Sequence, residues 1–270
     1  MTDVGPVMLI GAGKMGTALA RGWLDGGLAP SNLVLVDPHP GEAARELADD
    51  YGLTVNAEPV GLQPNVLVIA VKPQVVDPVL EALRPVVGPR TLVLSIAAGI
   101  GLERLAKGLG TDRIVRTMPN TPAQVGKGMS GAVAGPGVGP NEKQTVDLLL
   151  RAAGEVAWFE NESDLDAVTA VSGSGPAYVF HLVEAMAEAG RRQGLSEAVA
   201  MQLARQTVIG AAALMEADPT SAARLRENVT SPNGTTAAAL AVLMGKPGLT
   251  DLVDRAVDAA RKRSEELGRA

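Results

Sequence analysis

The sequence predicts an amino-terminal α/β domain of Rossmann type, residues 1–162, followed by an all-α carboxyl-terminal domain, residues 163–270. Short runs of Val, Leu and Ile alternate with Ala-rich stretches of helical character up to about residue 160, as in βαβ units with a parallel sheet. After the segment ENESD at 160–164 the strand pattern disappears, and apolar residues recur at spacings of three and four. Hydrophobic residues make up 46% of the chain and aromatic residues 2%, so the core is aliphatic.

Seven runs are expected to form the strands of the first domain. Each is rich in Val, Leu and Ile or ends at a turn signal, and Ala-rich helical segments separate most of them. In chain order they are 7–11, 33–37, 66–71, 91–95, 113–117, 129–134 and 155–159.

The second half is expected to be helical throughout. The segment 196–217 begins with Ser196 and Glu197, a typical helix start, and continues with helical spacing. The segments 230–234 (TSPNG) and 245–248 (GKPG) interrupt the pattern, and a polar-faced helix closes the chain. So much apolar surface in about a hundred residues predicts burial against a second subunit, so we expect a homo-oligomer.

Composition and charge narrow the classes of function. The net charge of −6 and the pI near 5.1 are unlike a nucleic-acid or membrane-surface protein, so we expect neither partner. The chain has no Cys and two His far apart in sequence, which argues against a metal site and a Ser-His-Asp triad. The amino terminus lacks the pattern of a signal peptide, and we expect a cytoplasmic protein.

A glycine-rich turn after the first predicted strand carries the main functional signal. Gly11, Gly13 and Gly16 form the pattern G-x-G-x-x-G between a strand and a helix. In dinucleotide-binding proteins the first glycine permits a tight turn, the second lets backbone reach a pyrophosphate, and the third lets helix and strand pack closely. The helix amino terminus then faces the anion.

The end of the second predicted strand bears on the choice of coenzyme. Asp37 lies 21 residues after Gly16, where a carboxylate bonds the ribose 2′-hydroxyl of NAD and repels the 2′-phosphate of NADP. The alternative is a solvent-facing turn residue in DPHPG. His39 and Arg45 could instead serve a phosphate, so NADH and NADPH both stay open.

Three further strand ends are expected to complete a crevice. The segments 68–74 (VIAVKPQ), 95–100 (SIAAGI) and 116–128 (RTMPNTPAQVGKG) each end a strand in small or proline-stiffened residues. Open α/β sheets bind ligands at the carboxyl ends of their strands.

From Met8 to about Gly245 the chain resembles the pyrroline-5-carboxylate reductase family. The motifs that carry the resemblance are IGAGKMG, AVKPQ, SIAAGI, RTMPNTPA, DAVTAVSGSGPAYVF and ENVTSPNGTT. The resemblance implies NAD(P)H-dependent reduction of the cyclic imine 1-pyrroline-5-carboxylate to L-proline, the final step of proline biosynthesis. It also implies a helical carboxyl-terminal dimerisation domain, with dimers often assembled further into a decamer.

The resemblance also implies the site residues. Its cofactor contacts fall on Ile10, Gly11, Ala12, Gly13, Lys14, Met15, Asn56, Ala70, Val71, Lys72, Pro73, Ile96, Ala97 and Ala98, to which the strand-end argument adds Asp37. Its substrate contacts fall on Glu162, Asn228, Ser231, Gly234, Thr235 and Thr236, with Thr169 close by. One departure is Asn233, where the family usually has Gly; Asn tolerates a left-handed backbone better than other non-glycine residues.

The imine explains why no strong acid is needed. It readily becomes an iminium, so positioning against the nicotinamide carries most of the work. We expect Thr236 and Thr169 to be the catalytic groups that hydrogen-bond the ring nitrogen, and the amides of SPNGTT to take the substrate carboxylate. The alternative for Thr236 is a helix N-cap without a ligand.

Two rival functions stay open at this point. A β-hydroxyacid dehydrogenase shares the glycine pattern but needs a general base, usually a Lys in the second domain, and none is apparent there. A non-catalytic NAD(P)-binding sensor is the other.

The segment VSGSGPAYVF at 171–180 is predicted to open a helix. Its serine does not stand in a G-x-S-x-G nucleophile turn, and it lacks the Gly-Lys-Ser/Thr of a phosphate loop. We expect Pro176 at or near the first helical position, with Ser172 or Ser174 as the cap and no covalent role for either serine.

Overall fold

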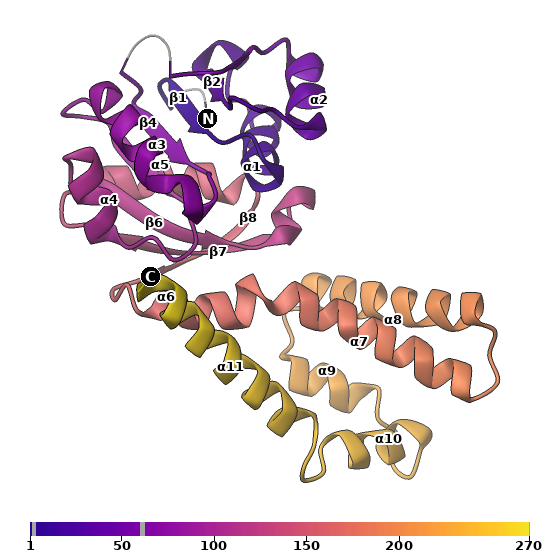
Figure 1. The fold of residues 1–270 in the computed structure, drawn as a ribbon. Coiled ribbons are helices and arrows are strands. Elements are labelled where there is room, and N and C mark those ends of the chain that lie inside the picture. The colour runs from indigo at the N-terminus through magenta and orange to yellow at the C-terminus, as the bar shows by residue number, and fades with distance from the viewer. Residues whose placement is uncertain (2–3, 60–62, 270) are drawn as a thin grey trace. The chain divides into compact units, whose positions relative to one another are not determined.

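A computed structural model describes residues 1, 4–59 and 63–269 of the chain. The chain divides into two compact units, one of Met1–Ser174 with Ala260–Ala270, the other of Gly175–Ala259 (Figure 1). The first is α/β and the second helical, which confirms the predicted fold class. The division into compact units falls after Ser174, whereas the predicted domain boundary follows residue 162. That boundary stays a prediction.

An eight-stranded sheet forms the centre of the first unit. The seven predicted strands are all present, and the sequence missed β3, which has only two half-buried residues. The strands are β1 (Val7–Ile10), β2 (Leu33–Val36), β3 (Val55–Asn56), β4 (Val66–Ile69), β5 (Leu92–Ser95), β6 (Ile114–Pro119), β7 (Gly128–Ala134) and β8 (Gly154–Phe159).

The strand order is β3-β2-β1-β4-β5-β6-β7-β8. The chain passes from β1 outward to β3 and then returns to β4 on the other side of β1, which places a topological switch between β1 and β4. Strands β1 to β6 are parallel, but β7 runs antiparallel to β6. The predicted parallel sheet is confirmed for β1 to β6, whereas β7 reverses direction because the loop from Pro119 to Gly128 is too short for a parallel crossover.

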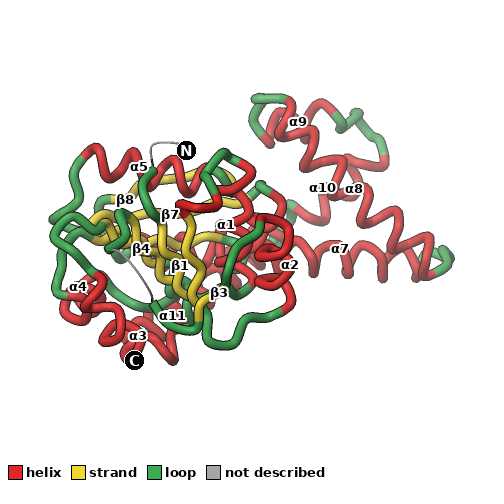
Figure 2. Tube along the Cα trace, turned by 90° about the horizontal axis from the view of Figure 1, so that it is seen from above, coloured by secondary structure: helices red, strands yellow, loops and turns green. Residues whose placement is uncertain are grey.

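Helices cover both faces of this sheet (Figure 2). Val7 and Leu9 of β1 pack in one cluster with α1 and α5, whereas Met8 and Ile10 pack in another with α3 and α4. This alternation follows from the two-residue period of a strand. The helices are α1 (Lys14–Asp25), α2 (Glu42–Tyr51), α3 (Val76–Leu83), α4 (Leu102–Leu109) and α5 (Pro140–Arg151); 3₁₀ segments are η1 (Pro30–Asn32), η2 (Pro73–Val75), η3 (Arg84–Val86) and η4 (Thr121–Val125).

A helical run begins earlier than the sequence predicted. Helix α6 (Asp164–Val168) continues into a π-helical turn, η5 (Thr169–Gly173), which leads to α7 (Gly175–Arg192). Helix α7 begins at Gly175, which confirms that Pro176 lies near the first helical position. Ser174 has right-handed helical angles at the end of the π turn, and the expected cap at Ser172 or Ser174 stays a prediction. The Asn120 amide donates to the Ser172 carbonyl and hydroxyl oxygens at 3.2 and 3.1 Å. A π turn disturbs the helical hydrogen-bond ladder in this way.

The second unit consists of helices with a very small core. Besides α7 it contains α8 (Glu197–Ala217), α9 (Ala222–Asn228), α10 (Thr235–Leu243) and α11 (Leu249–Arg269), whose last residues belong to the first unit. Its buried hydrophobic cluster is Ala187, Ala200 and Ala204. Large apolar residues elsewhere in this unit are exposed, among them Phe180 at 64% and Val242 at 76%. The chain alone therefore leaves much apolar surface uncovered.

One helix of the described residues, α8, is long and apolar enough to cross a membrane by length and composition. This is weak support for a membrane span, because a core helix of a soluble protein passes the same test.

Candidate functional site

The carboxyl ends of β1 and β4 meet at the topological switch, and the glycine-rich turn lies there. Gly11 has φ +93°, and a Cβ at this position would lie 2.7 Å from the Ala70 carbonyl oxygen. A Cβ on Gly16 would lie 2.2 Å from the Gly11 carbonyl oxygen. Both glycines are therefore required by the folded chain, the first for the turn and the second for the helix crossing.

Gly13 is different, because no atom of the described residues lies within 4 Å of the place where its Cβ would be. It is the N-cap of α1, and its backbone is in the extended region. The first amides of α1 have no partner within the helix, and Lys14 stands exposed in the first turn. A cation there opposes the helix dipole, so the arrangement favours a bound anion.

The Asp37 carboxylate lies at the end of β2 beside this turn. Its Oδ2 accepts the Ala12 amide at 2.9 Å, and its Oδ1 accepts the His39 amide at 2.8 Å. Asp37 is therefore an ordered part of the crevice wall and not a freely solvated turn residue.

A cavity of about 560 Å³ extends from the glycine turn between β2 and α3. Among the predicted cofactor residues, it is lined by Ile10, Gly11, Gly13, Asp37, Ala70, Val71 and Lys72. The sequence missed its apolar wall, which includes Val75, Val79 and Leu83. These apolar residues recur at helical spacing, as core residues do, so the sequence pattern does not distinguish a cavity-lining residue from a core residue. A mostly apolar cavity of this size suits an adenosine group.

The remaining predicted cofactor residues lie outside the lining of this cavity. They are Ala12, Lys14, Met15, Asn56, Pro73, Ile96, Ala97 and Ala98. The Asn56 side-chain amide donates to the Leu35 carbonyl oxygen at 3.1 Å, so it holds the edge of the sheet.

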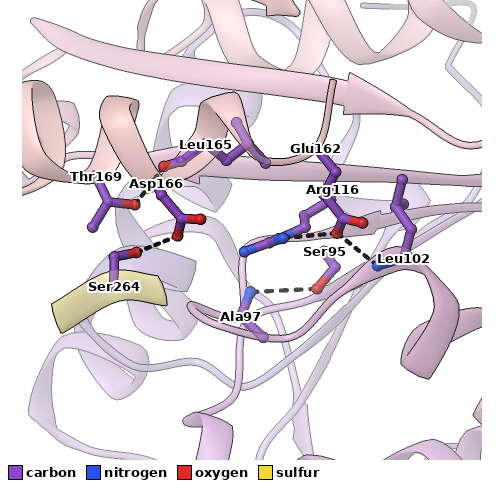
Figure 3. Close-up of polar contacts among 9 residues, drawn as sticks. All are labelled: Ser95, Ala97, Leu102, Arg116, Glu162, Leu165, Asp166, Thr169 and Ser264. Atoms are coloured by element: carbon purple, nitrogen blue, oxygen red, sulfur yellow. Dashed lines mark hydrogen bonds and ion pairs between the residues drawn. The ribbon is translucent and has the colours of Figure 1, made fainter. Parts of the chain in front are cut away.

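The loop after β5 is fixed at its start. The Ile96 amide donates to the Ile69 carbonyl oxygen at 3.0 Å, and the Ala97 amide donates to the Ser95 hydroxyl oxygen at 3.3 Å (Figure 3). Ala98 is exposed and Gly99 has φ +74°. The loop thus presents short residues at the third strand end of the crevice.

Two of the predicted substrate and catalytic residues belong to the first unit, and both are engaged. Glu162 Oε1 accepts the Leu102 amide and Arg116 Nη1, each at 2.7 Å (Figure 3). The Thr169 hydroxyl donates to the Leu165 carbonyl oxygen at 2.7 Å, one helical turn back. In this arrangement Thr169 keeps only its acceptor lone pairs for a ligand.

The other predicted substrate residues lie together in one loop of the second unit, between α9 and α10. Asn228 is the last residue of α9 and is exposed. Asn233 has φ +60°, the left-handed conformation expected where the family usually has Gly. The Gly234 amide donates to the Ser231 carbonyl oxygen at 3.1 Å and so closes the turn.

Helix α10 begins directly after this turn, with Gly234 as the N-cap. Thr235 and Thr236 are therefore inside the first turn, and Thr236 is not the N-cap. The Gly234 cap has no side chain, so the first amides of α10 are left for another acceptor. This arrangement suits the carboxylate of a small substrate.

Within the described ranges, no group of three or more His, Cys, Asp or Glu side chains is placed to hold a metal ion.

Family models match both parts of the chain. Residues 162–267 match a model described as pyrroline-5-carboxylate reductase dimerisation. Residues 6–99 match a model described as NADP oxidoreductase, coenzyme F420-dependent.

Relatives match over almost the whole chain. A pyrroline-5-carboxylate reductase of Pseudomonas aeruginosa is 42% identical, and the match covers 97% of this chain and 96% of that protein. One of Synechocystis is also 42% identical, with 97% of each covered. A solved reductase of this name from Coxiella burnetii has a TM-score of 0.91 and 33% identity, covering 98% of this chain and 99% of that one. A Plasmodium falciparum pyrroline carboxylate reductase with NADP bound has a TM-score of 0.80 and 29% identity, covering 99% of each.

The glycine turn gives a test that separates folding from binding. Gly13→Ala should lower the free energy of unfolding by no more than ~1 kcal/mol, because the added methyl group meets no described neighbour and Ala only weakens the N-cap of α1. It should raise the Kd of a nicotinamide dinucleotide at least ~10-fold, because the backbone can no longer approach the pyrophosphate. Fluorescence titration and urea unfolding measure the two quantities.

Gly16→Ala is the matched control. Its methyl group would meet the Gly11 carbonyl, so it should lower stability and binding together. A Gly13→Ala variant with unchanged Kd would contradict the placement of the pyrophosphate.

Proposed function

The chain belongs to the pyrroline-5-carboxylate reductase family, and from this premise we propose that it reduces 1-pyrroline-5-carboxylate to L-proline with NADH or NADPH. The observation that carries the proposal is the match to reductases of that name over 97% of the chain. The crevice at the glycine turn supports it independently, because its unpaired helix amides and apolar cavity suit a dinucleotide.

The reaction requires little acid–base chemistry. Hydride passes from C4 of the nicotinamide to the imine carbon while the ring nitrogen carries a proton, and the products are L-proline and the oxidised coenzyme. The iminium form already accepts hydride, so the protein contributes chiefly by holding the two reactants together. This account fits a helical unit without a buried lysine, since Lys246 is exposed.

The loop from Asn228 to Thr236 is the proposed substrate-binding segment. The amides of Thr235 and Thr236 at the start of α10 would hold the carboxylate, with Ser231 and Gly234 shaping the turn. The Thr236 hydroxyl would hydrogen-bond the ring nitrogen. Thr169 would contribute only as an acceptor, since its proton is donated to Leu165. Hydride transfer requires direct contact, so turnover requires these groups to meet the nicotinamide.

Turnover with the imine tests this assignment. Wild type should oxidise reduced coenzyme when 1-pyrroline-5-carboxylate is added, and Thr236→Ala should lower kcat/KM by about 10- to 100-fold. That range corresponds to a lost hydrogen bond to a charged group, about 1.5–3 kcal/mol. Coenzyme Kd should change less than about twofold, because the hydroxyl is assigned to the ring nitrogen of the substrate.

Thr236→Ser keeps the hydroxyl and should retain most of the activity. Equal turnover of wild type and Thr236→Ala would contradict the proposed hydrogen bond from the Thr236 hydroxyl to the ring nitrogen. Oxidation of a β-hydroxyacid, with no reduction of the imine, would instead favour a hydroxyacid dehydrogenase.

For the coenzyme, we propose a preference for NADH. The Asp37 carboxylate is held at the end of β2 by two backbone amides and lines the proposed adenosine cavity. A 2′-phosphate there would face a negative charge, whereas a 2′-hydroxyl can donate to it. His39 and Arg45 are both exposed, and no hydrogen bond or ion pair among the described residues directs either side chain to this position.

Asp37→Asn should therefore raise the ratio of kcat/KM for NADPH to that for NADH by about tenfold, which equals ~1.4 kcal/mol of removed repulsion. The amide oxygen of Asn can still accept one backbone amide, so the turn should persist. Steady-state kinetics with both coenzymes measure the ratio.

Glu58→Gln is the matched control, since Glu58 lines the same cavity but does not follow β2. It should change the ratio less than twofold. A wild-type preference for NADPH that Asp37→Asn does not alter would refute the assignment of Asp37.

The helical unit is proposed to complete its core in a homodimer, and the resemblance extends this to a decamer. Its buried cluster is three alanines, whereas large apolar side chains on α7, α8 and α10 are exposed. Lipid is a poorer covering than a second subunit, because Arg205 lies near the middle of α8. The acidic net charge likewise favours no nucleic-acid partner. A cytoplasmic location stays a prediction.

Light scattering tests the assembly. The chain mass is 27.7 kDa, and we expect a species of at least twice that mass at micromolar concentration. Its unfolding midpoint should rise with protein concentration, because folding and association are linked in obligate dimers. A stable 27.7 kDa species with a concentration-independent midpoint would contradict the shared core.

A further inference from the structure

Glu162 connects two elements that are far apart in the sequence. It lies between β8 and α6, and its Oε1 accepts both the Leu102 amide and Arg116 Nη1 at 2.7 Å (Figure 3). The Arg116 side chain is only 14% exposed and that of Glu162 34% exposed. A charge-assisted pair so shielded from water holds its geometry better than an ion pair on the surface.

The two donors show what this carboxylate fixes. Leu102 is the first residue of α4, and Arg116 lies on β6. The N-cap of α4 is Gly101, which offers no side-chain acceptor, so Glu162 supplies one from 60 residues away. A carboxylate at this end also complements the helix dipole. A Cβ on Gly101 would stand 3.5 Å from Glu162 Oε1, which shows how closely the backbone approaches.

The loop between Ser95 and Leu102 is thereby anchored at both ends. Its start is held by the Ile96 amide on the Ile69 carbonyl and by Ser95, and its end is held by Glu162. Between these anchors lie Ala98, which is exposed, and Gly99, whose φ is +74°. This is the loop whose residues Ile96, Ala97 and Ala98 are proposed to contact the cofactor.

We propose that Glu162 is a positioning residue that fixes the cofactor-binding loop after β5 through Leu102 and Arg116. The inference rests on the proposed function only in assigning this loop to the cofactor. Its Oε1 is shared by the Leu102 amide and Arg116 Nη1, so this oxygen is committed to the end of the loop and to β6. Removing it frees the end of the loop that is proposed to contact the cofactor.

Glu162→Ala should raise the coenzyme Kd about tenfold or more, since small displacements of positioning groups are costly. The KM for 1-pyrroline-5-carboxylate, measured at saturating coenzyme, should stay within about twofold of wild type. Glu162→Gln keeps an oxygen for the Leu102 amide but loses the charge toward Arg116. Its coenzyme Kd should therefore lie between the values of wild type and Glu162→Ala. Fluorescence titration of the coenzyme and steady-state kinetics give both quantities.

A double-mutant cycle tests the route of the effect. Arg116→Met should raise the coenzyme Kd in the same direction, and the double variant with Glu162→Ala should show less than the product of the single effects, because the two residues act together. Arg104→Ala is the matched control: it removes an exposed ion pair to Asp77 on the same helix α4 and should change the Kd less than twofold.

Three outcomes would overturn the inference. A raised KM for the imine with unchanged coenzyme Kd would make Glu162 a substrate ligand. A lower unfolding temperature with unchanged Kd in Glu162→Gln would leave it a structural residue only. Multiplicative effects of Glu162→Ala and Arg116→Met on the coenzyme Kd would show that Glu162 does not act through Arg116. If wild type fails to reduce the imine but the Kd still responds to Glu162, the proposed function fails and the positioning role stands.

Discussion

The close approach of the Gly11 turn to the Ala70 carbonyl is the constraint on which the cofactor crevice depends. Strand β1 must end and α1 must begin beside the end of β4, and a side chain at Gly11 would fill that space. The chain returns to β4 on the other side of β1, so the connections that follow these two strands leave in opposite directions and a crevice opens between them. Asp37, the loop after β5 and the apolar face of α3 are then placed around it by the register of the parallel strands.

Local pattern was enough to predict elements whose burial is uniform. The central strands are buried on both faces, so they read as unbroken aliphatic runs. The two-residue strand β3 has no such run, and the antiparallel direction of β7 depends on the length of a loop and not on the residues in the strand. The helix start near Pro176 was predicted, but the π turn before it was not, since the Asn120 amide that donates to the Ser172 carbonyl is over 50 residues away in sequence.

The same distinction applies to the candidate site. The glycine turn and Asp37 could be predicted because each has a fixed position relative to a strand end. The role of Glu162 could not, since its partners are the amide of Leu102 and the guanidinium of Arg116, and neither contact leaves a trace in local sequence. The apolar lining from α3 was equally hidden, because a helix with one face toward a core and another toward a ligand is apolar on both.

Gly13 has a consequence for how relatives of this chain can diverge. Gly11 and Gly16 are demanded by backbone atoms of the chain itself, so a descendant that no longer used a dinucleotide would still have to keep them. A side chain at Gly13 would meet no atom of the described residues, so a bound ligand is the reason to exclude a side chain there. A side chain at that single position would therefore mark a homologue that has kept the architecture and lost the coenzyme. Gly11 and Gly16 would be present in both kinds of homologue and would not distinguish them.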